Sequence, residues 1–111
     1  MDEAQQAKVL GLLGLGVRGR LALVGVDRVR DAVKGGKVRV AVVAADASPN
    51  ARQKIDGLLE GRRVPTLIVP SASELGRIAG KDSAAVIGVV DSKLAAGILA
   101  IAKPADAGRE A

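Results

Sequence analysis

Hydrophobic residues occur along this chain in two alternating patterns: short unbroken aliphatic runs, and stripes with helical spacing. The run from Val40 to Ala45 holds six aliphatic residues and ends at Asp46. A run this short, bounded by charged residues, is typical of a strand buried in the centre of a sheet. Similar runs lie at 21–24, 65–69 and 84–90. The pattern therefore predicts four strands, with the central one covering 38–45.

The segments between these runs carry apolar residues three or four positions apart. In 25–34, for example, Val26, Val29 and Val33 share one face, while charged residues occupy the other. The spacing predicts helices over 4–15, 25–34, 48–60, 71–79 and 92–102.

Start and stop signals support these helix boundaries. Ser48 followed by Pro49 gives an N-cap and a first helical position, and Ser71 with Glu74 forms a capping-box pattern. Asp91 or Ser92 caps the last helix. Glycines are predicted to end three helices: Gly14, Gly16 and Gly19 the first, Gly35 and Gly36 the second, and Gly80 the fourth.

Alternating helices and strands predict an α/β fold, with helices on both faces of a parallel or mixed sheet. With 111 residues, the chain fits one domain, which we expect to cover 1–103. The polar segment 104–111 is predicted to be a flexible tail.

Several classes of function are disfavoured by the composition. Phe, Trp, Tyr, Cys and His are all absent, which removes disulfides, thiol nucleophiles, histidine bases and Cys/His metal sites. No apolar run approaches the ~20 residues of a membrane helix, and the N-terminus lacks a signal-peptide pattern. We therefore expect a cytoplasmic protein without metal, cofactor or membrane contact.

Motifs for nucleotide chemistry are incomplete. Residues 14–19 read GLGVRG, but a helix precedes them where a dinucleotide site needs a strand. Residues 76–82 have one residue too few between the glycines for a phosphate loop, and Asp82 stands where Ser or Thr is required. Asp46, at a strand end, is assigned to supporting the start of the next helix. With no paired acids or histidine, we expect no enzymatic activity.

Positive charge is concentrated in one part of the chain. The formal net charge is +5. The segment 18–39 contains two acids, Asp27 and Asp31, and seven basic residues: Arg18, Arg20, Arg28, Arg30, Lys34, Lys37 and Arg39. Such clustering is the footprint of a polyanion-binding surface, although basic residues also solubilise an aliphatic domain. Without aromatic side chains for stacking, structured RNA read by shape, amides and cations fits better than single strands.

Five segments in order resemble the kink-turn-binding superfamily of ribosomal proteins, of the L7Ae/L30e type, and most closely its small bacterial members. They are LLGLGVRGRL (12–21), Gly25, VVAADASPN (42–50), Val64-Pro65, and Ser73-Glu74-Leu75-Gly76 with Gly80. The resemblance spans about residues 8–101. It implies a three-layer α/β/α sandwich around a four-stranded mixed sheet.

The resemblance also implies a function and a site. Members bind RNA through the N-terminus of the second helix and a loop before the last strand. Carried over, the RNA-binding residues are Arg18, Arg20, Gly25, Asp27, Arg28, Asp31, Lys34, Lys81, Asp82, Ser83 and Ala84. The implied partners are ribosomal or other kink-turn RNA, with ribosomal or assembly proteins, in the translation apparatus.

The recognition helix differs from that of the best-known members, which carry Asn-Glu followed by Lys. Here the residues are Asp27, Arg28 and Asp31. Asp27 accepts hydrogen bonds but lacks an amide donor, and Asp31 repels phosphate, whereas Arg28 can reach guanine edges or pair with Asp31. Two hypotheses follow: a non-catalytic protein that binds kink-turn-like RNA, or a protein-interaction module on the same fold with a degenerate RNA face.

Overall fold

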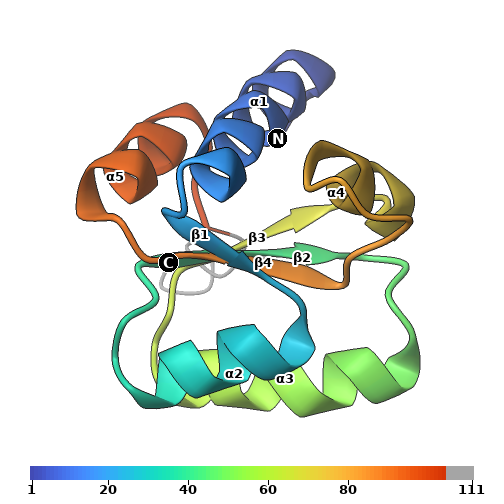
Figure 1. Ribbon diagram of the computed structural model, residues 1–111, viewed down its shortest axis with the longest axis vertical. Helices are drawn as coiled ribbons and strands as arrows, with labels where there is room; N and C mark the ends of the chain where they lie inside the picture. The colour runs from blue at the N-terminus through green and yellow to red at the C-terminus, as the bar shows by residue number, and fades with distance from the viewer. Residues whose placement is uncertain (105–111) are drawn as a thin grey trace.

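The computed structural model describes residues 1–104, in which helices and strands alternate (Figure 1). The helices are α1 (Glu3–Arg18), α2 (Val26–Lys34), α3 (Pro49–Gly61), α4 (Ala72–Ile78) and α5 (Ser92–Ile101). The strands are β1 (Ala22–Val24), β2 (Val40–Ala44), β3 (Thr66–Val69) and β4 (Val86–Val89). Each predicted element is present, with ends that differ by a few residues.

The four strands form one mixed sheet in the order β1-β4-β2-β3. β2 runs parallel to β3 and antiparallel to β4, which in turn is antiparallel to β1. All residues of β2 and β4 are buried, because these central strands are covered on both faces. This is why their sequences are continuously aliphatic.

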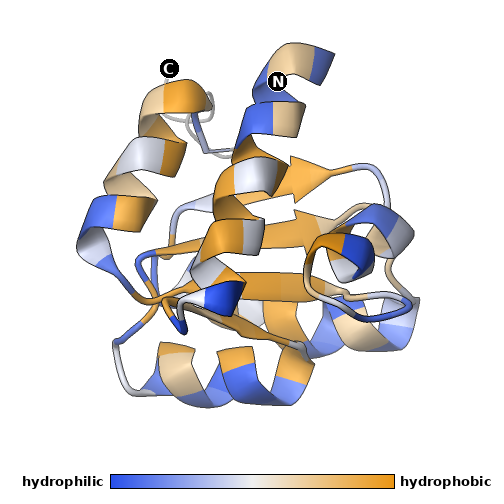
Figure 2. Ribbon diagram, turned by 45° about the horizontal axis from the view of Figure 1, so that its top comes forward, coloured by the Kyte–Doolittle hydropathy of each residue, from blue (hydrophilic) through white to orange (hydrophobic). Residues whose placement is uncertain are grey.

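Helices cover both faces of the sheet, so the fold is the expected α/β/α sandwich. α2 and α3 lie on one face, and α1, α4 and α5 on the other (Figure 1). Side chains of β2 alternate between the two cores: Val42 packs with the α1, α4 and α5 side, and Val43 with the α2 and α3 side. Figure 2 shows hydrophobic strands between helices that carry both hydrophobic and hydrophilic residues.

The predicted N-caps at Ser48 and Ser71 are confirmed. The Ser48 hydroxyl accepts a hydrogen bond from the Ala51 amide, and the Ser71 hydroxyl accepts one from the Glu74 amide, both at 3.1 Å. Of the two candidates for the last helix, Asp91 is the cap, since its carboxylate accepts from the Leu94 amide at 2.8 Å.

Of the three glycines predicted to end α1, Gly19 is confirmed as the C-cap, whereas the helix continues through Gly14 and Gly16 to Arg18. Gly14 and Gly16 serve close packing instead. A Cβ on Gly16 would lie 2.4 Å from Cδ2 of Leu94 in α5, so a side chain there would require the Leu94 side chain to move. Gly14 is also buried, close to Ile78 of α4.

Asp46 supports a helix, but a different one from that expected. Its Oδ1 accepts a hydrogen bond of 2.7 Å from the amide of Ala72, the first residue of α4. β2 and β3 are parallel neighbours, so their carboxyl ends lie together. The helix that follows β3 therefore begins beside the residue that follows β2.

The domain prediction of 1–103 remains a prediction, and residues 105–111 of the predicted tail lie outside the described structure. Among residues 1–104, no helix is long and apolar enough to cross a membrane.

Candidate functional site

An open pocket of about 400 Å³ lies where three segments distant in sequence meet. They are the end of α1 with β1, the first turn of α2, and the segment after α4. The lining residues are Val17, Arg20, Ala22, Leu23, Val24, Arg28, Ala79 and Lys81. Three cations, one from each segment, thus surround an aliphatic floor. We call this site the β1–α2 pocket.

Strand pairing brings these segments together. Val24, the last residue of β1, is paired with Ile87 of β4. The next residue, Gly25, donates its amide hydrogen to the carbonyl of Val86 at 3.0 Å. The start of α2 is thereby fixed beside the loop that leads into β4.

Gly25 has a backbone conformation that favours glycine, with φ +104° and ψ 154°. Side chains rarely adopt this region. A Cβ built on Gly25 would have no heavy atom within 4 Å, apart from its chain neighbours. The space over this residue is therefore open, and a ligand backbone can approach it closely.

The N-terminus of α2 has no side-chain cap. The other four helices of residues 1–104 have one, from Asp2, Ser48, Ser71 and Asp91. The first-turn amides of α2 face outward without such a partner, and the helix dipole adds a positive potential. This end of the helix can bind an anionic group.

The loop before β4 is held against α4 by its backbone. Lys81 donates its amide hydrogen to the carbonyl of Gly76 at 2.8 Å, and Ala84 donates to that of Ala72 at 2.9 Å. Lys81, Asp82 and Ser83 are exposed. Ala84, by contrast, is only 6% exposed and belongs to the core. Its side chain is therefore not available to RNA, and the RNA contact that the resemblance implies for Ala84 stays a prediction.

Four further predicted residues, Arg18, Asp27, Asp31 and Lys34, do not line the pocket. Asp27 and Arg18 are exposed at the start of α2 and the end of α1, on the segments that frame the pocket. Lys34 lies at the opposite end of α2 from Gly25, about 13 Å away for a nine-residue helix. Asp31 lies one turn before Lys34, and residues 1–104 hold no ion pair between Arg28 and Asp31.

The apolar lining of the pocket is not among the predicted site residues; it consists of Val17, Ala22, Leu23, Val24 and Ala79. Gly76, which gives the loop its position, is part of a family motif but is not a predicted site residue either. The two glycines, Gly76 and Gly80, can be seen in the sequence as a pair spaced by four residues. Their spacing does not show that the backbone of Ser83 packs against Gly76.

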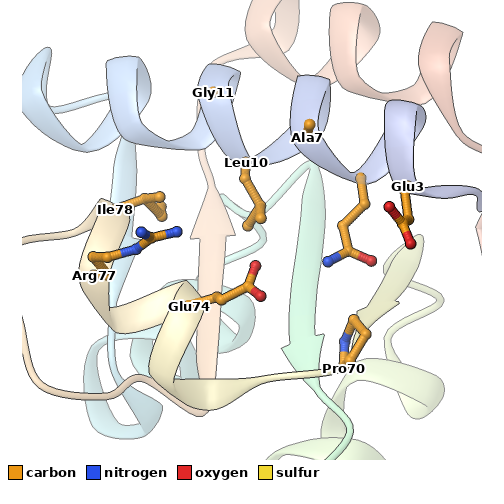
Figure 3. Close-up of a pocket in the computed structure, with 9 residues that line it drawn as sticks. Glu3, Ala7, Leu10, Gly11, Pro70, Glu74, Arg77 and Ile78 are labelled. Atoms are coloured by element: carbon orange, nitrogen blue, oxygen red, sulfur yellow. The ribbon is translucent and has the colours of Figure 1, made fainter.

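A second pocket, of about 650 Å³, lies between α1 and α4 (Figure 3). Leu10 and Ile78 form apolar walls, and Glu3, Glu74 and Arg77 bring charge from both helices. Carboxylates outnumber cations here, unlike in the β1–α2 pocket. Within residues 1–104 no group of three or more Asp, Glu, His or Cys side chains could hold a metal ion.

Comparisons with known proteins place this architecture in a family. Residues 7–99 match the model of the ribosomal protein L7Ae/L30e/S12e/Gadd45 family. The chain is 32% identical over 84 residues to the RNA-binding protein YlxQ of Bacillus subtilis (strain 168), covering 76% of this chain and 84% of that protein. It is 28% identical over 95 residues to the RNA-binding protein YlxQ of Enterococcus faecium, covering 86% and 91%.

Solved structures agree with the fold. A protein of unknown function from Bacillus halodurans C superimposes with a TM-score of 0.77 and 34% identity, over 86% of this chain and 96% of that one. The 15.5kD RNA binding protein of Giardia lamblia gives a TM-score of 0.78 at 22% identity, over 90% and 88% of the two chains. The second likeness shows the fold alone.

Proposed function

Because the chain belongs to the ribosomal protein L7Ae/L30e/S12e/Gadd45 family, we propose that it binds structured RNA at the β1–α2 pocket and catalyses no reaction. The observation that carries this proposal is that Arg20, Arg28 and Lys81 line one pocket, and that Arg28 belongs to the uncapped first turn of α2. The names of the YlxQ relatives, which are RNA-binding proteins, support the same class of ligand.

The phosphate backbone is bound by amides and cations. First-turn amides of α2 donate to a phosphate, which the open space over Gly25 allows to come close. Arg20 and Lys81 neutralise neighbouring phosphates and add salt-dependent affinity. Because the chain has no aromatic residue, the ligand is not held by base stacking on aromatic rings.

Base edges are read from the first turn of α2. The guanidinium of Arg28 has the geometry for a bidentate contact with guanine, and the Asp27 carboxylate accepts from a base amine. Both residues are exposed beside the pocket. A sharply bent RNA exposes base edges that a regular A-form duplex hides in its deep groove. Kink-turn-like RNA is therefore the proposed target, and the translation apparatus the proposed setting.

The test compares a labelled short-stem kink-turn RNA with a straight duplex of equal length, at low and moderate salt. The label belongs on the RNA, since the protein has no Trp or Tyr. We expect preference for the kink that persists at moderate salt. If both RNAs bind equally and the binding disappears as salt rises, the interaction is due to charge alone. That result would favour a protein partner for this face.

A further inference from the structure

Five exposed cations lie together at the end of the molecule opposite the first turn of α2. This distal basic patch consists of Lys34, Lys37, Arg39, Arg62 and Arg63. α2 and α3 both end here, on the left in Figure 1, and the chain passes from them into β2 and β3. Asp31 and Glu60 are the acids nearest in sequence on the two helices, so the cations remain in excess.

Hydrogen bonds fix the two halves of the patch relative to each other. The guanidinium of Arg62 donates to the carbonyl of Lys34 at 3.2 Å, which joins the ends of α3 and α2. Two residues after Arg39, the amide of Ala41 donates to the carbonyl of Pro65 at 2.9 Å. Cations from segments 28 residues apart in sequence are thereby held on one surface.

Arg63 is in a left-handed conformation, with φ +56°. Among residues 1–104 the only other non-glycine residue with positive φ is Arg20, at +63°, in the β1–α2 pocket. An arginine at such a position costs stability that glycine would not, about 1 kcal/mol or more. Each of the two basic regions thus keeps a guanidinium where the backbone itself favours glycine.

Helix dipoles account for only part of the patch. Cations near helix C-termini are stabilising within the last turn, which covers Lys34 and the capping residue Arg62. Lys37, Arg39 and Arg63 lie outside both helices. Their charge is therefore not explained by the helix dipoles, and an anionic partner that crosses this surface would contact all of them.

We propose that the distal basic patch binds the phosphate backbone of a stem of the same RNA that occupies the β1–α2 pocket. This inference rests on the proposed function. The two sites lie at opposite ends of α2, about 13 Å apart, so a stem leaving the pocket along this helix reaches the patch. A-form RNA presents regular rows of phosphates, which cations on a rigid frame recognise by shape rather than sequence.

The test uses the triple variant Lys37→Ala, Arg39→Ala, Arg63→Gly. The glycine suits the left-handed backbone at position 63, and Lys34 and Arg62 are kept so that the helix ends stay joined. The matched control is Lys8→Ala, Lys54→Ala, Lys103→Ala, which removes the same charge from exposed positions outside both basic regions. Each protein is titrated with the short-stem kink-turn RNA and with the same RNA carrying one extended stem.

We expect the patch variant to bind the extended RNA about tenfold more weakly at 0.1 M salt, with a salt slope smaller by roughly two to three units. Its affinity for the short RNA should stay within about twofold of wild type. Equal loss in the control variant, or no loss in the patch variant, would overturn the inference while leaving the pocket intact. If wild type binds neither RNA, or does not prefer the kink, the proposed function fails and this inference fails with it.

Discussion

The backbone of Ser83 occupies the place where a side chain on Gly76 would be. A Cβ built on Gly76 would lie 2.4 Å from the Ser83 Cα and 2.5 Å from its nitrogen. The loop that carries Lys81 and Asp82 is thus set directly on α4, and the hydrogen bond from Lys81 to the Gly76 carbonyl holds it there. The geometry of one side of the β1–α2 pocket depends on this contact.

Gly76→Ala is therefore expected to destabilise the fold and displace the loop. Backbone atoms cannot rotate away as a flexible side chain can, so we expect a loss of about 1–3 kcal/mol, measured by denaturant unfolding. RNA affinity should fall further than the loss of folded protein explains. The control is Gly57→Ala in α3, where the added methyl meets nothing within 4 Å and should stabilise by about 0.5–1 kcal/mol. If Gly76→Ala and Gly57→Ala were equally stable, the close contact between Gly76 and the Ser83 backbone would be contradicted.

Gly25→Ala tests the conformational role of the residue that precedes α2. At φ +104° the alanine is strained although its methyl has room, and we expect a cost of about 1–3 kcal/mol. Gly36→Ala, also at positive φ, is the matched variant outside the pocket; because Gly36 borders the distal basic patch, both variants are tested with the short-stem RNA. Thermal unfolding should detect both losses of stability. Only Gly25→Ala should also lower the RNA affinity of the molecules that remain folded. Similar RNA affinities of the two variants would argue against close approach at Gly25.

Arg28→Ala should weaken RNA binding without affecting the fold. The side chain is exposed, so stability should change by no more than about 0.5 kcal/mol. Loss of a base-edge contact is expected to cost about 1–3 kcal/mol in binding, whereas Lys8→Ala, remote from the pocket on α1, should change affinity little. Binding isotherms with the kink-turn RNA compare the affinities of Arg28→Ala, Lys8→Ala and wild type. An unchanged affinity would favour the protein-interaction module on this fold.

Asp31→Asn is expected to strengthen RNA binding severalfold. The exposed carboxylate lies on α2 between the pocket and the distal basic patch, so a bound phosphate backbone should feel its repulsion. The gain should shrink as salt rises, because the effect is a screened surface charge. A weaker complex would mean that Asp31 accepts hydrogen bonds from the RNA.

Asp46→Ala should destabilise the start of α4. The carboxylate accepts the hydrogen bond of the Ala72 amide, and loss of such a cap costs about 1 kcal/mol. Asp46→Asn retains an acceptor oxygen and should lose less. Chemical denaturation of the three proteins gives the comparison; equal stability of Asp46→Ala and wild type would mean that solvent replaces the cap.

Local pattern was sufficient for the architecture. The aliphatic run at 40–45 indicated a buried strand, which the structure has at Val40–Ala44, and Ser48 and Ser71 cap the helices where expected. These features depend on residues close in sequence, so their spacing carries the information. The alternation of helices and strands then limited the fold to an α/β layer architecture.

Tertiary packing decided what the pattern could not. Gly16 looks like a helix end in the sequence, but the approach of Leu94 makes it an interior packing position. Ala84 is carried into the core by its place before β4, and Asp46 caps α4 because β2 and β3 are parallel neighbours.

The same division holds for the basic residues. The sequence shows that positive charge gathers between Arg18 and Arg39, but not that α2 separates it into two regions. Lys34 lies about 13 Å from the start of α2 because a helix advances about 1.5 Å per residue, and Arg62 joins it only because α3 packs beside α2. Charge is a property of the sequence; which charges act together is set by contacts between residues far apart along the chain.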